Sequence, residues 1–65
     1  MNHREKIGKR IAEIRKLKGL SSEKLAEMSG VTNSNIVKIE NGKYNVSVDI
    51  LYKICKALEV EIKIE

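Results

Sequence analysis

The side chains of this sequence that could do chemistry are few, and their arrangement does not fit catalysis. His3 is the only histidine and Cys55 the only cysteine among 65 residues. No second metal ligand stands at helical spacing from His3, and Cys55 falls on an apolar helix face, where cysteine usually behaves as a small hydrophobe. No glycine-rich phosphate loop or close carboxylate pair occurs. The sequence therefore argues against an enzyme and implies no cofactor and no metal site.

Hydrogen bonding and charge neutralisation are the chemistry that remains. Lys and Arg number 13 against 9 Asp and Glu, which gives a net charge of +4. Residues 1–18 carry seven basic and two acidic side chains, whereas residues 57–65 carry one basic and three acidic. A basic end is typical of a surface that meets a polyanion, although a solvated helix face has the same pattern.

Four amphipathic helices must position these polar groups. The apolar periodicity predicts helices over about 4–18, 22–29, 33–40 and 48–58. We expect Leu17 to widen the apolar stripe of the first helix and Met28 to face inward on the second. The fold class that follows is all-α, a small bundle of four helices.

Short polar residues and glycines mark the ends of these helices. Ser21, Thr32 and Ser47 stand where N-caps are needed for the last three helices. Gly19 and Gly30 stand where the first two helices must end. Residues 41–45 are rich in turn formers, and we expect a loop there rather than a hairpin because the flanking patterns are helical.

The stretch from residue 21 to residue 42 has the spacing of a helix-turn-helix. Ala26 is small where two short helices must approach closely, and Gly30 lies four residues later, where a left-handed turn is required. Ile36 follows six residues on and anchors the next helix on the core. In a short, basic and helical chain this spacing indicates the motif that places a second helix in the major groove of DNA.

The sequence resembles the phage repressor/Cro-like (XRE) helix-turn-helix family over about residues 6–58. The matching segments are residues 7–11, 14–16, 19–21, 25–27, 30–31, 36, 38–43 and 51–58. The run Ile39-Glu40-Asn41-Gly42-Lys43 is the most specific of them. The resemblance implies a compact helical domain that binds operator DNA, usually as a two-fold dimer, with residues 33–40 as the recognition helix. It also implies a partly buried ion pair between Arg15 and Glu40. Departures from the family are Ser22 in place of Gln, Val46 in place of Pro, and a strand-like tail in place of a fifth helix.

The exposed side of the recognition helix should contact bases. Asn33 suits a bidentate contact to adenine, and Ser34 can bond to either kind of base. Lys38 can bond guanine or a phosphate, and Val37, an apolar residue on a polar face, suits a thymine methyl. The alternatives are ordinary helix-start chemistry for Asn33 and Ser34 and a scattered surface apolar residue for Val37.

Phosphate contacts should flank this helix on both sides. Ser22 and the free amides at the start of the second helix favour one phosphate. Asn41, Lys43 and Tyr44 follow the recognition helix and can hold another, with Asn45 a weaker candidate; a loop that merely turns is the alternative.

The last seven residues change period. Val60, Ile62 and Ile64 alternate with charged residues, which predicts a strand over 59–65 as a separate dimerisation segment after a domain of residues 1–58. Antiparallel pairing with a second copy, centred on Ile62, sets Val60 against Ile64 and Glu61 against Lys63. A frayed end or a short helix is the alternative.

A sequence-specific DNA-binding transcriptional regulator that acts as a homodimer is the function these features favour. The alternative is an antitoxin-like module whose main partner is a toxin or another protein. No stretch approaches the roughly 20 apolar residues of a membrane span, and the charged first ten residues do not have the pattern of a secretion signal. We therefore expect a cytoplasmic protein.

Overall fold

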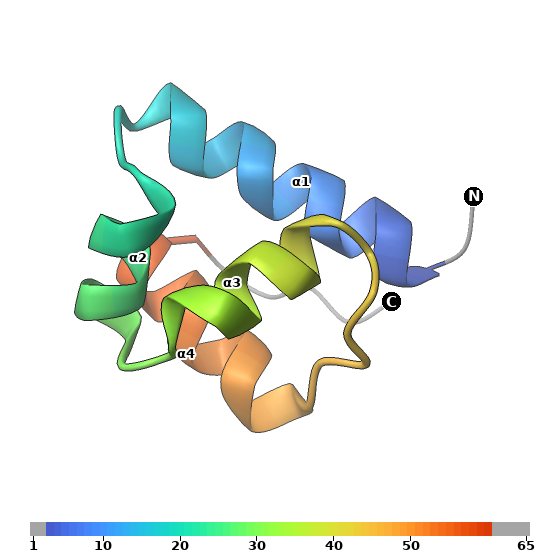
Figure 1. Ribbon diagram of the computed structural model, residues 1–65. Coiled ribbons are helices and arrows are strands. Elements are labelled where there is room, and N and C mark those ends of the chain that lie inside the picture. Colours follow the sequence, from blue (N-terminus) through green and yellow to red (C-terminus); the bar gives the residue numbers. More distant parts are fainter. Residues whose placement is uncertain (1–2, 61–65) are drawn as a thin grey trace.

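Four helices make up the computed structural model, which describes residues 3–60 (Figure 1). They are α1 (His3–Leu17), α2 (Ser22–Ser29), α3 (Asn33–Glu40) and α4 (Val48–Leu58). Each lies within one residue of its predicted bounds. The described residues are all-α, as expected, and residues 41–45 form a loop.

Side-chain caps start three of the helices as predicted. The hydroxyls of Ser21, Thr32 and Ser47 accept hydrogen bonds from backbone N–H groups in the first turns of α2, α3 and α4. Gly30 ends α2 in the left-handed conformation, with φ of 75°. These caps satisfy helix-end groups that would otherwise lack partners.

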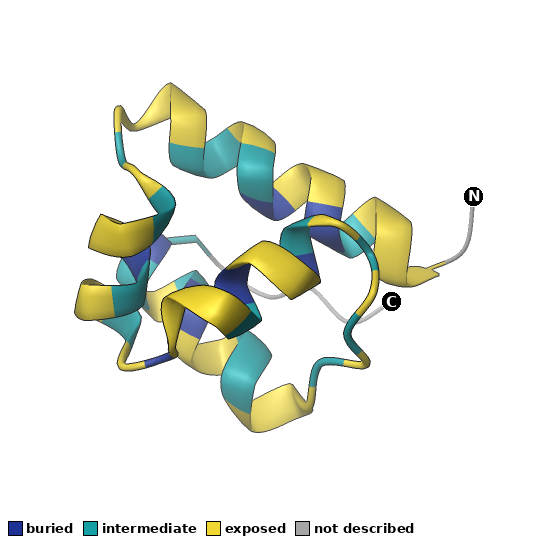
Figure 2. Cartoon of the chain, in the orientation of Figure 1, coloured by how far each residue is buried: buried dark blue, intermediate teal, exposed yellow. Residues whose placement is uncertain are grey.

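The core lies where the helices meet, and it is small (Figure 2). Its buried members are Ile11, Leu25, Val31, Ile36, Ile39, Ile54 and Leu58. Helix α3 packs against both α1 and α2, and α2 packs in turn against α4. Because α3 contacts α1 on one side and α2 on another, its buried face fixes its position in the bundle. Its other face stays open to solvent.

Two residues predicted to face inward are exposed. Leu17 is 81% exposed and Met28 is 46% exposed. Helix α2 buries the side that carries Leu25, Ala26 and Ser29, and at 100° per residue this side turns away from Met28. Leu17 lies in the last turn of α1, just before the chain turns at Gly19. The inward prediction was wrong for both.

The end of α4 corrects the predicted start of the C-terminal strand. Glu59 is left-handed, with φ of 59° and ψ of 41°. Its N–H donates to the carbonyl of Lys56, and the Val60 N–H donates to the carbonyl of Cys55. This 5→2 and 6→1 pair is the Schellman cap. Glu59 therefore belongs to the helix end and not to an extended strand, and Val60 packs against the core. Predicted strand residues Glu61, Ile62, Lys63 and Ile64 lie outside the described residues.

Helix α1 crosses α3 at Gly8, a close contact that the apolar periodicity did not predict. A Cβ placed on Gly8 would lie 2.0 Å from the carbonyl oxygen of Ile39 and 3.0 Å from its carbonyl carbon. Only glycine allows the two backbones to approach so closely. Its signal in the sequence is a glycine inside an otherwise regular amphipathic helix, where alanine would be favoured by about 1 kcal/mol.

Candidate nucleic-acid interface

The exposed face of α3 carries the four predicted base-contacting residues. Asn33, Ser34 and Lys38 are exposed, and Val37 is 41% exposed. The opposite face of the helix holds Ile36 and Ile39, which are almost completely buried. Burial of these two isoleucines sets the rotation of α3, so the polar row points away from the bundle.

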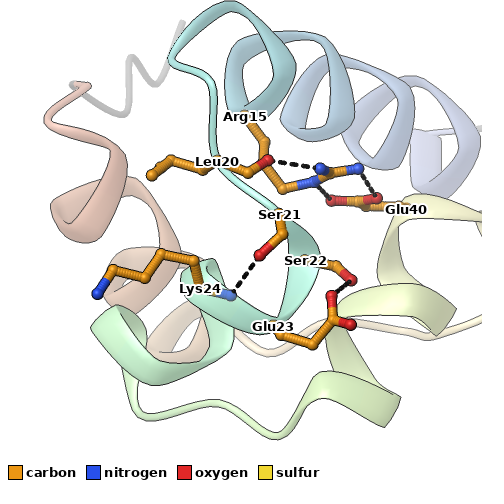
Figure 3. Close-up of polar contacts among 7 residues, drawn as sticks. All are labelled: Arg15, Leu20, Ser21, Ser22, Glu23, Lys24 and Glu40. Carbon is orange, nitrogen blue, oxygen red and sulfur yellow. Dashed lines mark hydrogen bonds and ion pairs between the residues drawn. The ribbon is translucent and has the colours of Figure 1, made fainter.

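The start of α2 lies beside α3 and presents a polar cluster (Figure 3). The Ser21 hydroxyl accepts from the N–H of Lys24 at 3.0 Å, which caps the helix. The Ser22 hydroxyl donates to the Glu23 carboxylate at 2.9 Å. Bonds from the Glu23 backbone N–H and from Ser22 lower the pKa of the Glu23 carboxyl. The sequence predicted a phosphate contact for Ser22 but did not indicate this bond. Because the Ser22 hydroxyl already donates to Glu23, a phosphate at Ser22 must displace the Glu23 carboxylate.

The residues after α3 divide into exposed and half-buried positions. Asn41 and Lys43 are exposed, and their backbone N–H groups bond to carbonyls of Val37 and Lys38. Tyr44 is half-buried and packs against the core. Hydrogen bonds thus fix the backbone of Asn41 and Lys43, and the side chains of these two residues are exposed to solvent. Part of the Tyr44 side chain, in contrast, packs against the core.

An ion pair ties α1 to the end of the recognition helix. Arg15 Nε lies 2.6 Å from Glu40 Oε2, and Arg15 Nη2 donates to Glu40 Oε1 at 3.0 Å. Their side chains are only 13% and 12% exposed. Arg15 Nη1 also donates to the Leu20 carbonyl at 2.8 Å, a bond that the sequence did not predict. The hydrogen bond to Glu40 raises the pKa of the Arg15 guanidinium.

The described residues give no support for metal binding or for thiol chemistry. Within residues 3–60, no three His, Cys, Asp or Glu side chains are arranged to hold a metal ion. Burial raises the pKa of the Cys55 thiol, so its neutral form is favoured. None of the described helices combines the length and the apolar character needed to cross a membrane.

The sequence profile of the HTH_3 helix-turn-helix family matches residues 11–64, which is most of the chain. This chain belongs to the HTH_3 family. Over 49 residues it is 45% identical to the HTH-type transcriptional regulator PuuR of Escherichia coli, covering 75% of this chain and 26% of PuuR. Over 54 residues it is 41% identical to an HTH-type transcriptional regulator of Archaeoglobus fulgidus, covering 83% of this chain and 77% of that protein.

The arrangement of helices also matches solved HTH_3-like structures. The restriction–modification controller protein C.AhdI from Aeromonas hydrophila superposes with a TM-score of 0.87 at 41% sequence identity. That superposition covers 89% of this chain and 88% of C.AhdI. The chain spans only about a quarter of the length of PuuR but most of the length of the C.AhdI chain.

Proposed function

We propose that this HTH_3 chain is a sequence-specific regulator of transcription that inserts α3 into the major groove of duplex DNA. The observation that carries the proposal is the exposed row Asn33, Ser34, Val37 and Lys38, held outward by the burial of Ile36 and Ile39. In helix-turn-helix proteins the first turns of the second helix reach base edges. Ser22 on one side and Asn41 and Lys43 on the other are the proposed phosphate contacts, and Tyr44 is a further one through its exposed part.

Selection of bound sequences from a random duplex pool tests this function directly. Enrichment of a defined motif supports base recognition, and an inverted repeat supports a two-fold dimer with half-sites about 34 Å apart. A pool that stays random after repeated rounds, at salt concentrations where the protein still binds, would contradict sequence-specific binding.

Substitutions on α3 and in the loop that follows it should separate base contacts from phosphate contacts. Asn33→Ala and Ser34→Ala should each weaken binding to the preferred site by about 1–3 kcal/mol and relax the base preference at one position. Lys43→Ala should weaken binding to all sequences equally and reduce the slope of log K against log salt by about one. Lys53→Ala on α4 is the matched control. An Asn33→Ala protein with unchanged affinity and preference would remove Asn33 from the interface.

Dimerisation through the residues from Val60 to Ile64 is part of the proposal. The alternating pattern and the need of a 65-residue chain for additional buried surface support it. Because Val60 packs on the core, a truncation should begin at Glu61 so that the domain itself stays intact. Removal of residues 61–65 should give a monomer in sedimentation and much weaker binding to a two-half-site duplex. A truncated chain that still sediments as a dimer contradicts this role.

A second candidate function is binding of a protein partner such as a toxin. Val48 and Tyr52 are 78% and 59% exposed and lie one turn apart on α4, and an exposed apolar pair of this kind suits a protein contact. Salt-dependent affinity for DNA distinguishes the two functions, because an interaction module without a DNA role should show none.

A further inference from the structure

A cleft of about 420 Å³ lies between α1 and the C-terminal end of α3, outside the surface assigned above to base contacts. Its lining residues are Glu5, Lys9, Ala12, Lys16, Glu40 and Asn41. Lys9, Ala12 and Lys16 are spaced by three and four residues, so they lie on one face of α1. Ala12 separates the two lysines with a side chain too short to fill the space between them.

The charges of this cleft favour an anionic ligand. Lys9 and Lys16 are exposed, and the ion pairs among residues 3–60 join other residues, namely Arg15 with Glu40 and Lys24 with Glu27. The Glu40 carboxylate in the cleft is already held by two N–H groups of Arg15, so its charge is compensated. Glu5 lies one turn before Lys9, which makes the end of the cleft near Lys16 the more positive one.

The cleft continues the exposed face of α3. Asn33, Val37 and Asn41 follow one another at four-residue spacing along the same side of that helix, and Asn41 also lines the cleft. Helices α1 and α3 pack directly against each other (Figure 1). A DNA strand that borders the groove occupied by α3 can therefore pass Asn41 and reach the lysines of α1.

We propose that the α1–α3 cleft is an additional site for the DNA backbone, in which Lys9 and Lys16 each neutralise a phosphate of one strand. The two lysines are seven residues apart on the helix, a rise of about 10 Å, so they contact separate phosphates rather than one. This site deepens the proposed function and rests on it. Its consequence is sequence-independent affinity: the cleft strengthens binding to every duplex and does not alter base preference.

Neutralising both lysines measures the contribution of the cleft. The Lys9→Gln/Lys16→Gln double variant should lower the slope of log K against log salt by about 1.8, because each phosphate contact contributes about 0.9. Lys6→Gln/Lys56→Gln makes the same change in net charge on exposed positions outside the cleft, and it should change the slope by much less. Lys9→Arg/Lys16→Arg should keep the slope of the wild-type protein.

A second pair of variants tests the site without removing a lysine. Ala12→Glu and Ala12→Gln have almost the same shape and differ by one negative charge. With a phosphate in the cleft, Ala12→Glu should bind duplex DNA about tenfold more weakly than Ala12→Gln at low salt, with equal thermal stability of the two proteins. Both should select the same DNA sequence as the wild-type chain.

The outcomes separate this inference from the proposed function. Equal slopes for the cleft and control double variants, or equal affinities of the two Ala12 variants, overturn the cleft site while wild-type binding to DNA still supports the function. Absence of salt-dependent DNA binding by the wild-type chain overturns the function itself and the cleft site with it. An effect of the cleft variants on binding to an acidic protein, but not to DNA, would assign the cleft to a protein partner and overturn the proposal.

Discussion

Replacing Gly8 by alanine is expected to destabilise the fold strongly. The new Cβ would lie 2.0 Å from the carbonyl oxygen of Ile39, and backbone atoms cannot move aside as a flexible side chain can. We expect a loss of about 3 kcal/mol in the free energy of unfolding. For a domain of this size that corresponds to a fall in Tm of about 12–24 °C. Thermal unfolding followed by circular dichroism measures it.

The sign of this effect separates crowding from helix propensity. In an open helix, glycine to alanine would stabilise the protein by about 1 kcal/mol, so a Tm at or above the wild-type value would show that α1 and α3 are not in close contact. Gly19→Ala is the control for backbone conformation. A Cβ on Gly19 meets nothing within 4 Å, but the residue has a φ of 70°, so that variant should lose only about 1 kcal/mol.

Replacing Arg15 by alanine should destabilise the fold by about 3 kcal/mol. The substitution leaves the Glu40 carboxylate, 12% exposed, without its two N–H donors, and it removes the donor to the Leu20 carbonyl. Chemical denaturation measures the change. Arg15→Lys keeps the charge but cannot make both bonds to Glu40, so it should restore only part of the stability.

The exposed pair of Lys24 and Glu27 is the matched control for this prediction. Their side chains are 54% and 75% exposed and their charged atoms are 3.8 Å apart, so Lys24→Ala should change stability by less than about 0.5 kcal/mol. If Arg15→Ala costs no more than Lys24→Ala, the Arg15–Glu40 pair is a solvent-screened contact with little energy. A further test adds Glu40→Met to an Arg15→Met variant. If the double variant regains stability, the unpaired charge of Glu40 is the cause of the loss.

Local sequence signals were sufficient for the helices and for the exposed row on α3. Caps at Ser21, Thr32 and Ser47 act within four residues of chain, and apolar periodicity marks Ile36 and Ile39 as the buried side of α3. Once that side is buried, the outward direction of Asn33 and Ser34 follows from helix geometry. These features were predicted because every interaction that produces them is local or depends on one helix face.

Tertiary packing decided the features that depend on two elements at once. Met28 has an apolar side chain at a plausible spacing, but α2 packs on α3 and α4 and buries the side of Leu25, which leaves Met28 exposed. Glu59 reads as the start of an alternating strand, yet the cap of α4 holds it in a left-handed conformation. The approach at Gly8, the bond from Arg15 to Leu20 and the cleft lined by Lys9 and Lys16 each join α1 to another segment. A one-dimensional pattern records which residues are apolar or charged, but the distance between two helices is set by how their side chains fit, and only the packed structure contains it.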